Sequence, residues 1–371
     1  MSSTTQRSLP LDVLRGIAVT LVLFRHRELF AWTQYMGWIG VDLFFVLSGF
    51  LVSGLLFKEY KAHGTIAPVR FLVRRGFKIY PTFYMLLGFM VWLKYAIGEF
   101  SWIGLASEAV FLQNYVWGFG WWGVTWSLAV EEHFYFSLTF MLYWLMRTGR
   151  FQRDNGKWFL RGLLVMMVCC QILRIITNRW FTVVHGIPMD LANFTMTHLR
   201  YDSLLAGVLI AYYHHFRPEA LQRFGHRFRH WLVPTCIALA SFSPFLYAIR
   251  SPFVKTYGFT LLYVGFGLLL IHVLVNVRSM GNGVMARWFG MVGKASYSIY
   301  LIHAFTATIM EQWICPRPEG FAVYWSFALY FASSIAIGWL VFAGWESVFL
   351  RMRERWFPSR SLAPTPIMPP I

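Results

Sequence analysis

The chain has 371 residues, of which 57% are hydrophobic and 13% are charged, and its formal net charge is +17. This composition excludes a water-soluble globular protein and indicates a polytopic membrane protein. The cations do not indicate a nucleic-acid binder, because they gather in alternate connections between apolar segments, as membrane topology requires.

Windows of about 20 apolar residues, the length that crosses a bilayer, recur along the whole chain. They lie near residues 11–31, 37–57, 79–98, 125–146, 159–178, 198–216, 231–250, 255–277, 295–314 and 323–350. We therefore expect an all-α bundle of about ten transmembrane helices. Residues 99–124 are apolar but broken by glycine, so we expect a re-entrant or interfacial segment between the third and fourth spans. Residues 1–357 should form a single transmembrane domain, followed by a disordered cytoplasmic tail over residues 358–371.

The basic residues predict the orientation of this bundle. Connections on one side carry 22 lysines and arginines, whereas the other side carries four, Arg179, Arg250, Lys255 and Arg317. The positive-inside rule places the basic side and both termini in the cytoplasm of a multi-pass inner-membrane protein. The four cysteines have no metal-ligand spacing, and we expect no metal.

The first apolar window contains Arg15 and His26, eleven residues apart. An α-helix would place them on one face, about 16 Å from each other along the axis. Ionisable side chains inside a membrane span are costly unless they are paired or wetted, so both residues are candidates for function.

Later windows also carry polar residues. Asp42 lies in the second window, and Ser127, Glu131 and Tyr135 line up on one face of the fourth. Glu131 and Glu132 are adjacent, so we expect them to face different surroundings.

Two further groups lie in the sixth and ninth windows. Arg200 and Asp202 are two positions apart and point away from each other, so each needs its own partner. Ser296, Tyr300 and His303 form a stripe that favours a hydrogen-bonded seam between helices over a chemical role.

Several sequence motifs resemble those of the membrane-bound acyltransferase family 3. They are Leu11-Asp12-Val13-Leu14-Arg15-Gly16, Gly40-Val41-Asp42-Leu43-Phe44-Phe45, Arg74-Arg75-Gly76-Phe77-Lys78, Trp126-Ser127-Leu128, Arg200-Tyr201-Asp202 and Ser296-Tyr297-Ser298 with His303. They occur in the family's order over residues 11–303, which makes the resemblance more specific than any single motif. The chain resembles the stand-alone form, without the periplasmic SGNH-type domain that larger members append.

The resemblance implies a ten-helix enzyme that transfers an acyl group, usually acetyl, from cytoplasmic acyl-CoA to a hydroxyl of a carbohydrate or lipid-linked glycan. His26 corresponds to the family's histidine and would act as general base, which suits an imidazole near neutral pH. A carboxylate would steady the imidazolium, with Asp42 as first candidate and Glu131 or Glu132 as second.

The family's paired cytoplasmic arginines correspond to Arg75 and Lys78, which would bind CoA phosphates together with Arg15. Lys78 departs from the pattern, because lysine lacks the bidentate fork of arginine, and Arg74 could compensate.

Other interpretations remain open. His26 could be a hydrogen-bonded core histidine, Arg15 could pair with Asp12, and the basic residues of the third span also fit the topology rule. The intramembrane His, Asp, Glu and Arg residues are equally typical of a proton-coupled secondary transporter, but we find no inverted repeat. A membrane scaffold is a third possibility. The acceptor and the oligomeric state cannot be predicted.

Overall fold

The computed structural model describes residues 8–116, 121–181, 183–184, 187–277, 283–316 and 319–360. The first eight α-helices are α1 Leu9–His26, α2 Ala31–Met36, α3 Ile39–His63, α4 Pro68–Ala96, α5 Trp102–Ala109, α6 Gln113–Val116, α7 Trp126–Arg147 and α8 Lys157–Trp180. They are followed by α9 Met189–Thr195, α10 Tyr201–Phe216, α11 Pro218–Arg227, α12 Leu232–Ala240, α13 Phe259–Asn276, α14 Val284–Lys294, α15 Ser296–Ile309, α16 Phe321–Val341 and α17 Ser347–Trp356.

Shorter elements join these helices. Two are 3-10 turns, η1 Arg153–Gly156 and η2 Thr197–Leu199, and three are π-helical turns, η3 Val254–Gly258, η4 Met310–Ile314 and η5 Phe342–Glu346. The strands β1 Val183–Val184 and β2 Ile187–Pro188 form a small antiparallel pair. The all-α prediction is therefore confirmed.

Five stretches of described helix are long and apolar enough to cross a membrane, which supports a polytopic membrane protein. They are Ala31–His63, Pro68–Ala96, Arg153–Trp180, Val254–Asn276 and Phe321–Trp356. The other predicted windows coincide with α1, α7, α10, α12 and α15, which are shorter or more polar. A total of ten crossings stays a prediction.

The first helix is shorter than the apolar window predicts. It ends at His26, and Arg27 has an extended backbone with φ −144° and ψ 130°. This conformation lets the buried guanidinium of Arg27 donate to the carbonyl of Cys315 at 2.8 Å. His26 is consequently the last residue of this helix.

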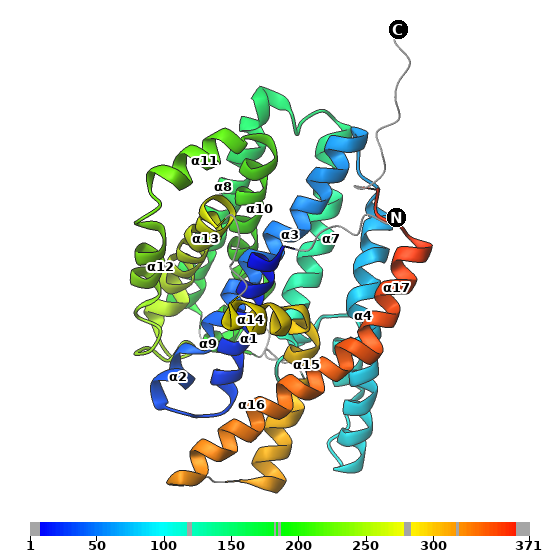
Figure 1. Cartoon of the computed structure of the whole chain (residues 1–371), viewed down its shortest axis with the longest axis vertical. Helices are drawn as coiled ribbons and strands as arrows, with labels where there is room; N and C mark the ends of the chain where they lie inside the picture. The colour runs from blue at the N-terminus through cyan, green and yellow to red at the C-terminus, as the bar shows by residue number, and fades with distance from the viewer. Residues whose placement is uncertain are drawn as a thin grey trace.

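Helix α3 runs through the middle of the bundle, with α8, α10 and α13 on one side and α4 and α7 on the other (Figure 1). It packs closely against α10 through two glycines. A Cβ atom at Gly49 would lie 1.9 Å from the carbonyl oxygen of Leu204, and one at Gly207 would lie 2.2 Å from that of Val46. Only glycine fits at these positions, which fixes α3 as the central support of the site.

Two buried ion pairs cross-link the same helices. Arg200 of α10 donates to Asp42 of α3 at 2.7 Å, and Arg174 of α8 donates to Asp202 of α10 at 2.5 Å. All four side chains are fully buried. The prediction that Arg200 and Asp202 find separate partners is confirmed.

The segment between α4 and α7 is anchored to the start of α7. The carboxylate of buried Glu108 accepts a hydrogen bond from the Thr125 hydroxyl at 2.8 Å, and Gln113 donates to the Thr125 carbonyl at 2.9 Å. Trp102 is exposed. Residues 117–120 lie outside the described residues, and the re-entrant or interfacial location stays a prediction.

Predicted basic connections gather at one end of the bundle. Lys61 donates to the carbonyl of His215 at 3.1 Å, and Arg217 donates to that of Asn155 at 2.7 Å. Arg70 donates to the carbonyl of Pro358 at 2.7 Å. These contacts join the ends of α3 and α10, the connections after α10 and α7, and the start of α4 with the end of the described chain. Residues 361–371 of the predicted tail, Arg278 and Arg317 lie outside the described residues.

Candidate active site

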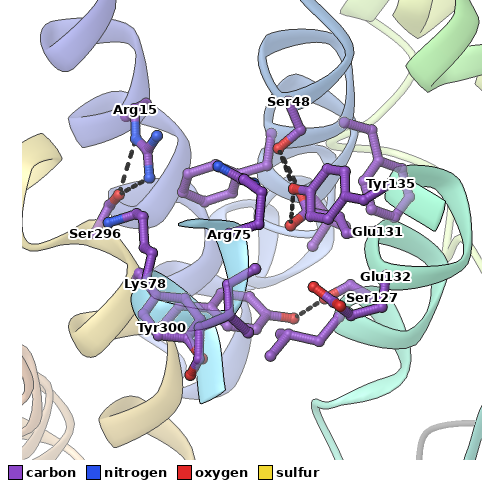
Figure 2. Close-up of a pocket in the computed structure, with 16 residues that line it drawn as sticks. Arg15, Ser48, Arg75, Lys78, Ser127, Glu131, Glu132, Tyr135, Ser296 and Tyr300 are labelled. Carbon is purple, nitrogen blue, oxygen red and sulfur yellow. Dashed lines mark hydrogen bonds between the residues drawn. The ribbon is translucent and has the colours of Figure 1, made fainter. Parts of the chain in front are cut away.

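Two cavities adjoin inside the bundle. One, which we call the basic pocket, has a volume of about 70 Å³ and includes Arg15, Arg75, Lys78, Glu131 and Glu132 in its lining (Figure 2). The other, which we call the histidine cavity, has a volume of about 400 Å³ and includes Arg25, His26, Gln34, Trp38, Trp126 and Tyr247. Val41 and Tyr300 line both cavities and form their common wall.

Arg15 enters the basic pocket from α1. Its Nε and Nη2 atoms donate to the Ser296 hydroxyl at 3.2 and 3.1 Å, as Figure 2 shows. These two bonds fix the guanidinium of Arg15 to α15 at the edge of the pocket.

Arg75 and Lys78 enter the same pocket from α4, but Arg74 does not. The guanidinium carbon of Arg75 lies 4.3 Å from the centre of the Tyr135 ring, and Lys78 pairs with Glu346 at 2.7 Å. The π-helical turn η5 presents this glutamate, which is fully buried. Arg74 donates instead to Glu354 of α17 and to the carbonyl of Phe357.

Glu131 and Glu132 both line the basic pocket, and each bonds to a different neighbouring helix. Glu131 accepts hydrogen bonds from Ser48 at 2.5 Å and from Tyr135 at 2.8 Å, whereas Glu132 accepts one from Tyr80 at 3.0 Å. Adjacent residues lie about 100° apart around a helix, and a pocket between α3 and α4 is wide enough to include both directions.

His26 is exposed to the histidine cavity at the end of α1. Its ring centre lies 4.6 Å from that of His303, in an edge-on arrangement. The Nδ1 atom of His303 bonds to the carbonyl of Tyr300, and its buried Nε2 atom has no hydrogen-bond partner among the described residues. A carbonyl can only accept, so Nδ1 carries the hydrogen and Nε2 of neutral His303 is an acceptor.

The carboxylates predicted to steady His26 lie elsewhere. Asp42 is the partner of Arg200, and both glutamates lie in the basic pocket. No carboxylate forms a hydrogen bond or ion pair with His26 in the part of the chain that the structure describes. Asp42 is needed at Arg200, because a buried arginine without a counterion would be strongly destabilising.

Helix α15 connects the two cavities through the predicted stripe of polar residues. Ser296 accepts from Arg15, and the Tyr300 hydroxyl lies 2.6 Å from that of Ser127 and donates to the carbonyl of Val124 at 2.9 Å. The stripe therefore makes the predicted contacts between helices. It also faces both cavities and ends at His26, which the helical spacing alone did not indicate.

Sequence reasoning missed the polar residues around His26. Arg25 donates to the hydroxyl of Tyr247 at 3.1 Å and to the carbonyl of Gln34 at 3.4 Å. Arg25 could have been predicted to lie near the site, because it directly precedes His26 in the sequence. Tyr247 lies more than 200 positions away, and nothing in its surroundings marks it as part of a site.

Comparison with known proteins gives a family. Residues 10–343 match the acyltransferase domain of acyltransferase family 3. Peptidoglycan O-acetyltransferase OatA of Listeria monocytogenes is 25% identical over 321 residues, which cover 79% of this chain and 48% of that protein. O-acetyltransferase OatA of Staphylococcus aureus is 26% identical over 328 residues, or 80% of this chain and 50% of that protein.

The chain thus spans about half the length of these curated relatives. No solved structure matches it significantly. Since the family match covers nearly all of the residues that build the two cavities, the chain belongs to acyltransferase family 3.

Proposed function

We propose that the protein is a membrane O-acyltransferase that moves an acetyl group from cytoplasmic acetyl-CoA to a hydroxyl of a carbohydrate or lipid-linked glycan. The observation that carries the proposal is the common wall of Val41 and Tyr300, with cations on one side and His26 on the other. Family membership supports it, and so do relatives named O-acetyltransferases.

The basic pocket is the donor site in this proposal. Arg15 and Arg75 would hold CoA phosphates by charge-assisted hydrogen bonds, and Lys78 would add a point charge that it shares with Glu346. Arg74 bonds to Glu354 and is absent from the pocket lining, so the proposal gives it no contact with the phosphates. The narrow pantetheine arm would then carry the thioester past Tyr300 toward the histidine cavity.

His26 is the proposed general base. It would take the proton of the acceptor hydroxyl while that oxygen attacks the thioester carbonyl carbon. The carbon–sulfur bond then breaks, and the leaving thiolate takes the proton from the imidazolium. The products are the acetyl ester and free CoA, and His26 returns to its neutral state.

His303 is the proposed positioning residue for His26. Its Nε2 atom can accept the N–H of His26, which would leave the other ring nitrogen of His26 free for the acceptor hydroxyl. This role replaces the one predicted for a carboxylate. Glu131 and Glu132 would instead act in the donor site, and Asp42 would act through Arg200 by supporting α3.

The proposal includes an orientation. The end that gathers the basic connections would face the cytoplasm, with both termini on that side of the inner membrane. The glycan acceptor would then reach His26 from the opposite side. A relative named peptidoglycan O-acetyltransferase supports a glycan as the acceptor class.

The test is acetyl transfer by the purified full chain, with radiolabelled acetyl-CoA and a panel of N-acetylglucosamine, N-acetylmuramic acid and peptidoglycan fragments. His26→Ala should lower transfer by about 100-fold or more, the usual range for a lost general base. His230→Ala is the matched control, because His230 is exposed and lies outside both cavities. Full transfer by a folded His26→Ala protein would overturn the proposal.

A further inference from the structure

The histidine cavity contains a cation without a matching acid. Arg25 lines it, and within the described ranges its guanidinium bonds to two neutral groups, the Gln34 carbonyl and the Tyr247 hydroxyl. Among the described residues that line this cavity, none is an aspartate or a glutamate. The protein therefore builds a positive cavity around His26.

Two other arginines inside the bundle have acidic partners. Arg174 pairs with Asp202, and Arg200 pairs with Asp42. These ion pairs offset the cost of placing an arginine between helices, whereas buried Arg27 donates to the Cys315 carbonyl and the Ser326 hydroxyl. Arg25 has no carboxylate partner among the described residues, and it lines a cavity that a ligand can enter. A negative group on the ligand would therefore supply the counterion.

The aromatic lining of the cavity supports a ligand as well. Trp38 is 4% exposed and lines the cavity. Its indole nitrogen is enclosed by neighbouring atoms, so a ligand would meet the ring and not the N–H. The aromatic residues Trp38, Trp126 and Tyr247 also offer apolar surface for the C–H face of a sugar.

We propose that the histidine cavity binds an acidic glycan, with Arg25 holding a carboxylate or phosphate of the acceptor. The aromatic rings would pack against the sugar, and a hydroxyl close to the anionic group would face His26. The cavity, at about 400 Å³, has the size of a small-molecule site. This inference rests on the proposed function, because it names the substrate class of the same site.

The experiment measures binding without an acetyl donor, by calorimetry on the full chain in detergent. The probes are methyl β-glucuronide, glucose 1-phosphate and the neutral methyl β-glucoside. Wild-type protein should bind at least one anionic probe about tenfold more tightly than the glucoside, which is the usual strength of a charge-assisted contact. The better anionic probe tells whether the natural group is a carboxylate or a phosphate.

Variants assign that preference to Arg25. Arg25→Gln should abolish it, and Tyr247→Phe should reduce it, because the hydroxyl that fixes the guanidinium is lost. Arg250→Gln is the matched control, since Arg250 is an exposed cation close to the same tyrosine ring but outside the cavity lining. This control should keep the full preference.

Three results would overturn the inference. They are equal affinity for the three probes, no binding of either anionic probe at millimolar concentration, and an anionic preference that survives in Arg25→Gln. If Arg25→Gln fails to fold, Tyr247→Phe decides the question. Because no acetyl-CoA is present, these outcomes are separate from the His26→Ala test of acetyl transfer.

Discussion

The two cavities differ in how the protein compensates their polar groups. In the basic pocket, Lys78 has Glu346, Glu131 has Ser48, and Glu132 has Tyr80. In the histidine cavity, Arg25 bonds to neutral groups among the described residues, and no aspartate or glutamate is part of the described lining. The basic pocket thus holds both signs of charge before a ligand binds, whereas the histidine cavity holds a cation whose counterion a ligand would supply.

Because the two cavities share only a wall, substitutions can test each cavity separately. Donor binding should depend on residues on one side, acceptor binding on residues on the other, and the rate of transfer on both. The four changes below are ordered from the largest expected effect to the smallest.

His303→Ala should lower kcat for acetyl transfer by about 100-fold, because His26 would lose the acceptor that orients it. The KM for acetyl-CoA should stay the same, since the donor site is untouched. His303→Gln retains an acceptor atom in a side chain of similar reach and should recover about tenfold. A parallel loss of kcat and donor affinity in His303→Ala would show a structural role only.

Arg75→Ala combined with Lys78→Ala should weaken CoA binding by about 30-fold, because two charge-assisted contacts to phosphate are lost. Equilibrium binding of CoA to purified protein measures the effect. Arg74→Ala is the matched control, since Arg74 bonds to Glu354 outside the pocket, and it should change the affinity by less than about threefold. If the two proteins behaved alike, the basic pocket would not be the donor site.

Tyr300→Phe should lower transfer by about fivefold, while binding of CoA and of sugar probes is retained. The substitution removes the hydroxyl that bonds to Ser127 and to the carbonyl of Val124, which loosens the common wall. Tyr330→Phe serves as control, because its fully buried hydroxyl lies outside both cavities. Weaker CoA binding in Tyr300→Phe would place this residue in the donor site alone.

Lys78→Arg should strengthen CoA binding by about threefold at most. It supplies the bidentate fork that the family pattern has at this position, but the pairing with Glu346 limits the gain. The same equilibrium measurement detects it. Tighter binding by a factor of 30 or more would mean that Glu346 does not compete for this side chain.

Much of the fold could be predicted from hydropathy and charge. Apolar windows located the main helices, and the spacing of Ser127, Glu131 and Tyr135 correctly gave one face of α7. These predictions depend on neighbours along one helix, whose geometry is fixed by the α-helical repeat.

The rest could not be predicted, because it depends on distances between helices. Asp42 was the first candidate to stabilise His26, because it is an acid in one of the family motifs. Its partner is instead Arg200, 158 positions away. His303 was assigned to a helix seam, and only the packing of α15 against α1 brings it to His26. The roles of Asp42 and His303 therefore depend on contacts between helices, which the spacing of residues within one helix does not reveal.

The contacts made by the end of the described chain can form only late in synthesis of the protein. Arg70 and Arg74 of α4 donate to the carbonyls of Pro358 and Phe357, and Lys78 pairs with Glu346. The third predicted span is inserted early, but its cations cannot reach these partners until almost all of the chain has left the ribosome. A prematurely terminated chain would therefore carry His26 beside an unfinished donor pocket.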